Sequence, residues 1–196
     1  MADHQTAGRG RLGRRWEAPA GSALLVSVLL RPSDLPVERL HLVTAAVAVA
    51  AAEACTAVTA GEVAPTLKWP NDLVVDDRKL AGVLAETALP AVVVGCGINV
   101  TWAPEGAAYL GAGVARDGLL VALLERLGDR YGRWDDVASA YRRRCSTLGR
   151  LVRVDLGDET FTGHAADITD DGHLLVETGA CLRTVTAADV VHLRPA

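Results

Sequence analysis

The sequence has no excess of positive charge, and this narrows the classes of partner that it can bind. Its 196 residues carry 20 Lys and Arg against 24 Asp and Glu, which gives a formal net charge of −4. A nucleic-acid backbone is bound by a net positive surface, so this balance argues against a general nucleic-acid binder, and any basic cluster must be local. The hydrophobic share is 50% and the charged share 22%, a composition typical of a soluble globular protein.

Long apolar runs and a signal sequence are also missing. The longest apolar run, residues 42–52, is shorter than the roughly 18 residues that cross a bilayer, and Arg39 and Glu53 flank it. Polar residues and then an Arg/Gly stretch follow Met1, which is not the pattern of a signal peptide. We therefore expect a cytoplasmic protein that has no contact with a membrane.

The cysteines lack the spacing of a metal site. They lie far apart, without a CxxC pair and without nearby histidines at zinc-ligand spacing: Cys55, Cys96, Cys145 and Cys181. We expect buried free thiols in a reducing cytoplasm. The sequence also shows no Ser/His/Asp or Cys/His arrangement, so nothing indicates a covalent enzyme intermediate.

The first two thirds of the chain predict an α+β fold of short strands and covering helices. The apolar run at residues 23–30 predicts a strand buried on both faces, and Pro36 opens a long Ala/Val/Leu helix to about residue 57. Strong turn signals then separate several strand segments, at residues 66–69, 73–75, 80–85 and 91–100. Two amphipathic helices follow, at about residues 117–131 and 135–144.

The last part of the chain has a different pattern. From residue 151 onward, apolar and polar residues alternate, with turn signals at residues 157–158 and 170–172. Four or five short strands in this stretch predict a small barrel. No linker-like tract separates it from the rest, so we expect it to pack directly on the main domain.

A glycine- and arginine-rich segment is the first candidate for a binding element. Residues 8–15 read GRGRLGRR, four arginines and three glycines in eight residues. Glycines let backbone N–H groups approach an anion, and guanidinium forks match carboxylate or phosphate oxygens. A flexible loop of this kind suits a polyanionic small molecule. Taken alone, it also fits an unstructured RNA-binding arm or a solvated tail.

The second candidate is LKWPNDLVVDDRKLAG, residues 67–82. It places Lys68 at the end of a strand, Asn71 in a turn opened by proline, and Lys79 at the start of the next strand, before Gly82. An ammonium group at a dry strand end favours a bound anion. Each lysine alone also fits a surface charge beside a hairpin, and the Asn-Asp pair fits a plain turn.

The third candidate is GCGIN, residues 95–99. Side chains alternate along a strand, so Gly95 and Gly97 lie on one face and leave it bare. Another group can then approach the backbone. The same two glycines also fit close packing inside a buried strand.

In this order, the Arg/Gly loop, the KWPND turn, the RKLAG strand and the GxGIN strand resemble the biotin protein ligases. The most specific segments are QTAGRGRLGRRW and KWPND with RKLAG, and the resemblance runs from His4 to Arg194. The family's catalytic domain is similar to the cores of class II aminoacyl-tRNA synthetases and lipoate ligases. The resemblance implies a mixed, mostly antiparallel sheet with flanking helices in residues 1–146, and an SH3-like barrel in residues 147–196.

The resemblance also implies a role for each matched residue. The catalytic residues would be Arg11, Lys68 and Lys79. Biotin and its adenylate would be bound by Gln5, Gly8, Arg9, Gly10, Arg11, Lys79, Gly82, Gly95 and Gly97. ATP would be bound by Arg14, Arg15, Trp16, Lys68, Asn71, Asn99 and Arg194, with Mg²⁺ bridging its phosphates near Asn71.

The implied chemistry explains the residue types. The carboxylate of biotin attacks the α-phosphorus of ATP, and two unit charges 4 Å apart repel by about 4 kcal/mol at an effective dielectric near 20. Arg11, Lys79 and Mg²⁺ would offset that repulsion, so no protein nucleophile is required. A lysine of a biotin carboxyl carrier protein would then attack the mixed anhydride, while an ordered loop excludes water.

One part of the family pattern has no counterpart from Met1 onward. The family has a strand, a Ser/Thr-Asn turn and a helix before the segment that begins at Ala2, and the Ser/Thr side chains bind the ureido group of biotin. We therefore expect this chain alone to bind biotin weakly. The alternatives are a lipoate or octanoate ligase of the same fold, a non-catalytic ligand-binding remnant, and nucleic-acid binding through the Arg/Gly arm.

Overall fold

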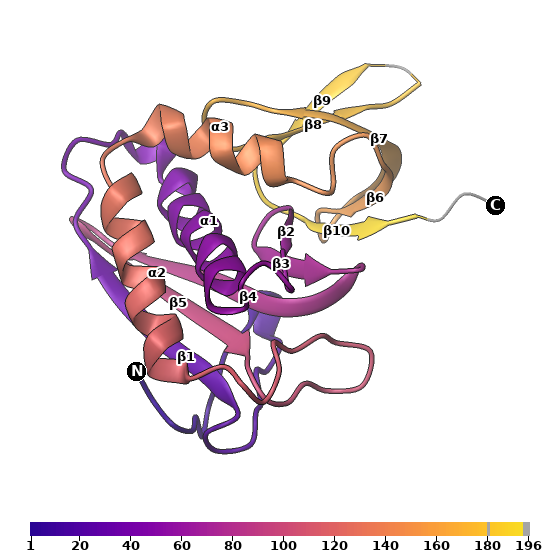
Figure 1. The fold of residues 1–196 in the computed structure, drawn as a ribbon. Coiled ribbons are helices and arrows are strands. Elements are labelled where there is room, and N and C mark those ends of the chain that lie inside the picture. The colour runs from indigo at the N-terminus through magenta and orange to yellow at the C-terminus, as the bar shows by residue number, and fades with distance from the viewer. Residues whose placement is uncertain (180, 194–196) are drawn as a thin grey trace.

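Two five-stranded sheets and three α-helices form the structure, a computed structural model that describes residues 1–179 and 181–193 (Figure 1). The first sheet has the order β1-β5-β4-β3-β2. Its strands are β1 (Ala23–Leu30), β2 (Thr66–Lys68), β3 (Asp72–Val75), β4 (Arg78–Ala88) and β5 (Ala91–Asn99). All neighbours in this sheet pair antiparallel, which confirms the predicted mostly antiparallel α+β fold.

Helices cover one face of the first sheet. α1 (His41–Val58) lies between this sheet and the other two helices, α2 (Arg116–Arg130) and α3 (Trp134–Arg144) (Figure 1). Its burial explains why it is apolar nearly all round. Val37–Val58 is also long and apolar enough to cross a membrane, but 67% of its most apolar window is buried inside the fold, as in a core helix.

Two details of this region differ from the prediction. Pro36 precedes a 3₁₀ turn, η2 (Val37–Arg39), and the α-helix begins only at His41. The strand at residues 23–30 was predicted to be buried on both faces, but only its first half is, and Ser27 and Leu29 are exposed. The reason is that Ser27 and Leu29 lie on the face of the sheet that borders a cavity, which Ser27 lines.

The second sheet is the small SH3-like barrel, with the order β10-β6-β7-β8-β9. Its strands are β6 (Leu151–Asp155), β7 (Thr160–Ile168), β8 (Leu174–Glu177), β9 (Leu182–Val185) and β10 (Asp189–His192). Burial alternates along β6 and β8, as the sequence pattern predicted, so one side of each strand forms the core of the barrel. The barrel packs beside α3 and the β2–β3 hairpin (Figure 1).

The prediction of buried thiols is confirmed for three cysteines and wrong for one. All four are free, and Cys55, Cys96 and Cys145 are buried. Burial raises the pKa of the Cys96 thiol to about 12. Cys181 is exposed because it lies in the tight turn between β8 and β9, where Thr178 accepts its backbone N–H.

Candidate functional site

A cavity of about 580 Å³ lies on the face of the first sheet that α1 leaves uncovered. Its volume is in the range of small-molecule sites. Five segments line it: the Arg/Gly loop, the middle of β1 at residues 25–27, the Lys68–Asp72 turn, β4 with β5, and the start of β10 at Asp189. The cavity therefore lies where the two sheets and the N-terminal loop meet.

Three glycines make the floor of this cavity. Gly82 of β4 is the register partner of Gly97 on β5, and Gly95 lies two residues away on the same face. A Cβ at position 97 would lie 2.8 Å from the Trp16 ring, and one at position 82 would lie 3.3 Å from Nζ of Lys79. The ring of Trp16 thus rests directly on strand backbone that carries no side chain of its own.

The Arg/Gly segment forms a short hairpin beside this floor. Arg9 and Arg15 form an antiparallel bridge, and the backbone N–H of Gly10 donates to the carbonyl of Arg14 at 2.7 Å. The tip is a 3₁₀ turn, η1 (Arg11–Gly13), in which Gly13 has a φ of 71°. The glycines therefore permit the tight turn, as their sequence pattern suggested.

The three cations predicted to be catalytic line the same cavity. Nη1 of Arg11 donates to Oδ1 of Asn71 at 3.3 Å, and Nζ of Lys79 lies 2.7 Å from Oδ1 of Asp72. Lys68 completes the set from the end of β2. Nζ of Lys79 is also 5.8 Å from the centre of the Trp16 ring, within reach of a cation–π contact.

Carboxylates set the electrostatics of these cations. Burial lowers the pKa of the Arg11 guanidinium, and the nearby Asp189 and Asp72 partly oppose that shift. Asp189 forms an ion pair with Arg14, and this hydrogen bond lowers the pKa of the Asp189 carboxyl. The barrel strand β10 therefore contributes a negative charge that holds the Arg/Gly hairpin.

The turn between β2 and β3 is held from several sides. Nδ2 of Asn71 donates to the carbonyl of Val83 at 2.9 Å, which joins the turn to β4. The hydroxyl of Tyr141, on α3, donates to the carbonyl of Pro70 at 3.0 Å. The backbone N–H of Trp69 donates to Oγ1 of Thr147 at 3.0 Å. These bonds fix the backbone that carries Lys68 and Asn71.

The structure brings together most of the residues that the sequence predicted for the site. Those that line the cavity are Gln5, Arg9, Gly10, Arg11, Arg14, Arg15, Trp16, Lys68, Asn71, Lys79, Gly82, Gly95 and Gly97. Gly8 lies in the hairpin just outside the lining, and a Cβ there would lie 2.2 Å from the carbonyl oxygen of Trp16. Arg194 lies outside the described residues.

Asn99 is placed away from the others. Its side chain is buried, with a relative exposure of 3%, and its Nδ2 donates to the carbonyl of Ala108 at 2.9 Å. It therefore holds the loop after β5 and does not line the cavity.

Sequence reasoning missed Asp72, Trp69 and Asp189 as lining residues. Asp72 follows directly after Asn71, so the motif itself carried a signal for it. Asp189 comes from a strand more than a hundred residues away, and no local pattern marks it.

Comparison with known proteins supports the same interpretation. Residues 1–99 match the model of the Biotin/lipoate A/B protein ligase family, and residues 147–193 match the Biotin protein ligase C terminal domain. A biotin–[acetyl-CoA-carboxylase] ligase of Mycobacterium tuberculosis is 42% identical over 99% of this chain and 78% of its own length. A bifunctional ligase/repressor of Bacillus subtilis is 28% identical, and this chain spans 64% of it.

A solved structure agrees with these matches. The biotin protein ligase of Aquifex aeolicus, in complex with biotin and ATP, superposes with a TM-score of 0.82 over 99% of this chain and 88% of its own, at 28% identity. The N-terminal match defines the class, that of the biotin and lipoate protein ligases. Within this class, the chain belongs to the biotin protein ligase family.

Proposed function

We propose that this chain joins biotin to AMP, using ATP, and then transfers biotin to a lysine of a biotin carboxyl carrier protein. The observation that carries the proposal is the meeting of Arg11, Lys68 and Lys79 beside a floor of three glycines in one cavity. Cations at this density suit a site where two anions must meet, and the glycine floor, which the ring of Trp16 contacts in this structure, suits a flat ring. The family matches support the choice of biotin.

The first step needs charge compensation. A carboxylate and an α-phosphate about 4 Å apart repel by about 4 kcal/mol at an effective dielectric near 20. Arg11 and Lys79 would bind the two anions and stabilise the charge that develops during attack. Their present partners, Asn71 and Asp72, hold both side chains in place before substrate arrives. That preorganisation lowers the cost of ordering them.

The remaining residues divide between the two substrates. The biotin side would be Gln5, the hairpin residues 8–11, and the glycines of β4 and β5. The ATP side would be Lys68, Asn71, Asn99 and Arg194 together with Arg14, Arg15 and Trp16. For Asn99, this role would be indirect, through the loop that its amide holds.

Magnesium would arrive with the nucleotide. No group of three or more His, Cys, Asp or Glu in residues 1–179 and 181–193 could hold a metal ion. The oxygens of Asn71 and Asp72 at the cavity fit an ion that keeps most of its contacts to phosphates and water. When bound, Mg²⁺ would neutralise phosphate charge.

The second step needs a site that is closed to water until the carrier arrives. The Arg/Gly hairpin stands beside the cavity and can close over an adenylate, which would protect the anhydride from hydrolysis. The amine of the carrier lysine would then displace AMP, and no protein nucleophile takes part. We place this reaction in the cytoplasm, where both carrier and ATP are available.

Pyrophosphate release tests the proposal. The chain is incubated with ATP, Mg²⁺ and either biotin, lipoate or octanoate, and then with a carrier domain whose mass is followed. We expect release with biotin and a mass gain on the carrier that corresponds to one biotin. Release with lipoate or octanoate alone would identify the related ligases instead. Ligand binding without any release would identify a non-catalytic remnant.

A rival from another class makes a different prediction. Nucleic-acid binding through the Arg/Gly arm predicts gel shifts that weaken as salt rises. Each of the four arginines in the hairpin has an oxygen partner within the fold: Glu86 for Arg9, Asn71 for Arg11, Asp189 for Arg14 and Glu17 for Arg15. We therefore expect no salt-dependent shift, and stabilisation by biotinyl-AMP instead.

A further inference from the structure

The turn between β7 and β8 is built as a compact unit. In residues 169–173, the N–H of Thr169 donates to the carbonyl of His173 at 2.8 Å. The N–H of Gly172 donates to the carbonyl of Thr169 at 2.9 Å. Gly172 has a φ of 90°, and a Cβ there would lie 3.3 Å from Cβ of His41 at the start of α1. The turn thus has a defined shape and rests directly on the catalytic part of the chain.

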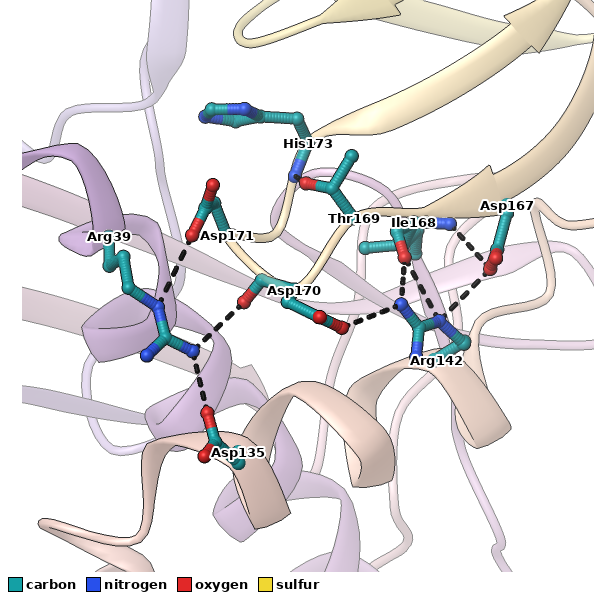
Figure 2. Close-up of polar contacts among 9 residues, drawn as sticks. All are labelled: Arg39, Asp135, Arg142, Asp167, Ile168, Thr169, Asp170, Asp171 and His173. Carbon is teal, nitrogen blue, oxygen red and sulfur yellow. Dashed lines mark hydrogen bonds and ion pairs between the residues drawn. The ribbon is translucent and has the colours of Figure 1, made fainter.

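Two arginines from that part hold the turn (Figure 2). Nη2 of Arg39 donates to the carbonyl of Asp170 at 3.2 Å, and its Nε lies 3.2 Å from the carboxylate of Asp171. Arg142, on α3, lies on the other side. Its Nε donates to the carbonyl of Ile168 at 2.9 Å, and its Nη2 donates to Oδ1 of Asp170 at 3.3 Å.

The same turn contacts the Lys68–Asp72 segment through one hydrogen bond. The indole N–H of Trp69 donates to the carbonyl of Gly172 at 3.0 Å. Trp69 is buried, with a relative exposure of 3%, so its indole N–H depends on this acceptor. Trp69 stands directly after Lys68 and two residues before Asn71, both of which line the cavity. The orientation of its ring therefore affects where those two side chains lie.

We propose that the β7–β8 turn is a positioning element for the adenylation site, with Arg39 and Arg142 as positioning residues that act through Gly172 and Trp69. The inference rests on the proposed function, because it concerns how that reaction's ATP-side residues are held. Neither arginine lines the cavity, so neither is a catalytic residue. The alternative is that these contacts only hold the barrel against the helices, which affects stability alone.

A double-mutant cycle separates the two interpretations. Trp69→Phe keeps an aromatic ring and removes the N–H together with the five-membered ring that carries it, and we expect kcat/KM for ATP to fall about tenfold. Arg142→Ala should lower it about fivefold. If Arg142 acts through Trp69, the double variant falls no further than Trp69→Phe alone. Falls that multiply would overturn the proposal, because they would mean that the two residues act independently.

A measurement that does not depend on activity tests the link itself. The chain has four tryptophans, so ¹⁵N spectra show at most four indole N–H signals, and Trp69→Phe identifies one by its loss. Arg142→Ala should speed exchange of the Trp69 indole proton with solvent at least about tenfold, because its acceptor becomes mobile. Unchanged exchange would contradict the proposal. If the wild-type chain releases no pyrophosphate, the proposed function fails, while this exchange still decides the positioning role.

The chain offers a matched control and a milder variant. Arg183 makes a two-pronged ion pair with Glu159 at 2.8 Å in the same barrel, away from the turn, and Arg183→Ala should change neither readout. If Arg142→Ala does not fold, Asp167→Asn weakens one contact of Arg142 and keeps the arginine. The double-mutant cycle is then made with Asp167→Asn and Trp69→Phe, and smaller falls in kcat/KM for ATP are expected. Falls that multiply in the double variant would again overturn the proposal.

Discussion

The two sheets of this protein have the same number of strands and the same antiparallel pairing, but they use their faces differently. The first sheet packs one face on α1 and leaves the other bare at Gly82, Gly95 and Gly97. The second sheet curls around its own core, and its loops and edges contact the first. A binding surface thus arises where side chains are absent, and the second sheet completes it with Asp189 and the β7–β8 turn.

The two sheets should differ most in the rate of adenylate formation that remains after one positive charge is removed from each. Lys79→Ala removes a cation from the cavity, and we expect adenylate formation to slow about 10²- to 10³-fold, as for a lost transition-state contact. Arg153→Ala removes an exposed cation from β6 and should change the rate less than about twofold. Pyrophosphate release measures both. Equal losses would show that charge in general, and not the cavity, governs the rate.

The stability that the protein gains at the junction between the two sheets should depend on pH. Burial, together with the nearby charges of Lys68 and Arg150, lowers the pKa of His192 on β10 to about 4, although Asp77 partly opposes this shift. The unfolded state then binds more protons between pH 6.5 and pH 4, so stability is complete above about pH 6.5 and falls by about 3 kcal/mol toward pH 4.

Urea unfolding at a series of pH values measures this effect. His192→Gln keeps a side chain that can hydrogen-bond to Thr147 and removes the titration. We expect a flatter profile for the variant below pH 6.5 and parallel profiles above it. Parallel profiles across the whole range would mean that His192 does not contribute.

Glycines in the two sheets should respond in opposite ways to the same substitution. Gly97→Ala places a methyl group on the cavity floor, 2.8 Å from the movable ring of Trp16, so biotin affinity should fall about tenfold with little loss of stability. Gly163→Ala places a methyl group 2.5 Å from the carbonyl oxygen of Glu177. This oxygen belongs to the backbone, so it cannot move aside as a side chain can. The substitution should cost about 1–3 kcal/mol of stability and leave biotin affinity intact.

Calorimetry with biotin and thermal unfolding separate the two glycine effects. If Gly97→Ala lost stability and kept its affinity for biotin, the bare floor would be a packing feature and not a binding surface.

The smallest effect concerns the cysteines. The thiols of Cys55 and Cys96 in the first part of the chain are buried, whereas Cys181 in the barrel is exposed. A thiol reagent should label about one cysteine in the native protein and all four after denaturation. Cys181→Ser should abolish the native labelling and change the free energy of unfolding by less than about 0.5 kcal/mol. Fast native labelling of two or more thiols would contradict the described burial.

Local patterns in the sequence were enough to predict most of the elements and two of the three glycines in the floor of the site. Alternation along a strand places Gly95 and Gly97 on one face, and the structure has them there. The apolar stretch of α1 and the turn at Pro70 follow equally from short-range rules. The residues predicted to be catalytic came from the motifs of the family resemblance, and Arg11, Lys68 and Lys79 do line one cavity.

Other features depended on how the chain packs. The pairing of Arg14 with Asp189 joins residues 175 apart, and the bond from Trp69 to Gly172 joins residues 103 apart. Such contacts exist only once the barrel has docked on α3, and no local period encodes that docking. Packing also turned the amide of Asn99 toward Ala108 and left Cys181 exposed. The sequence by itself determined which residues could form a site, and the tertiary structure decided which of them meet.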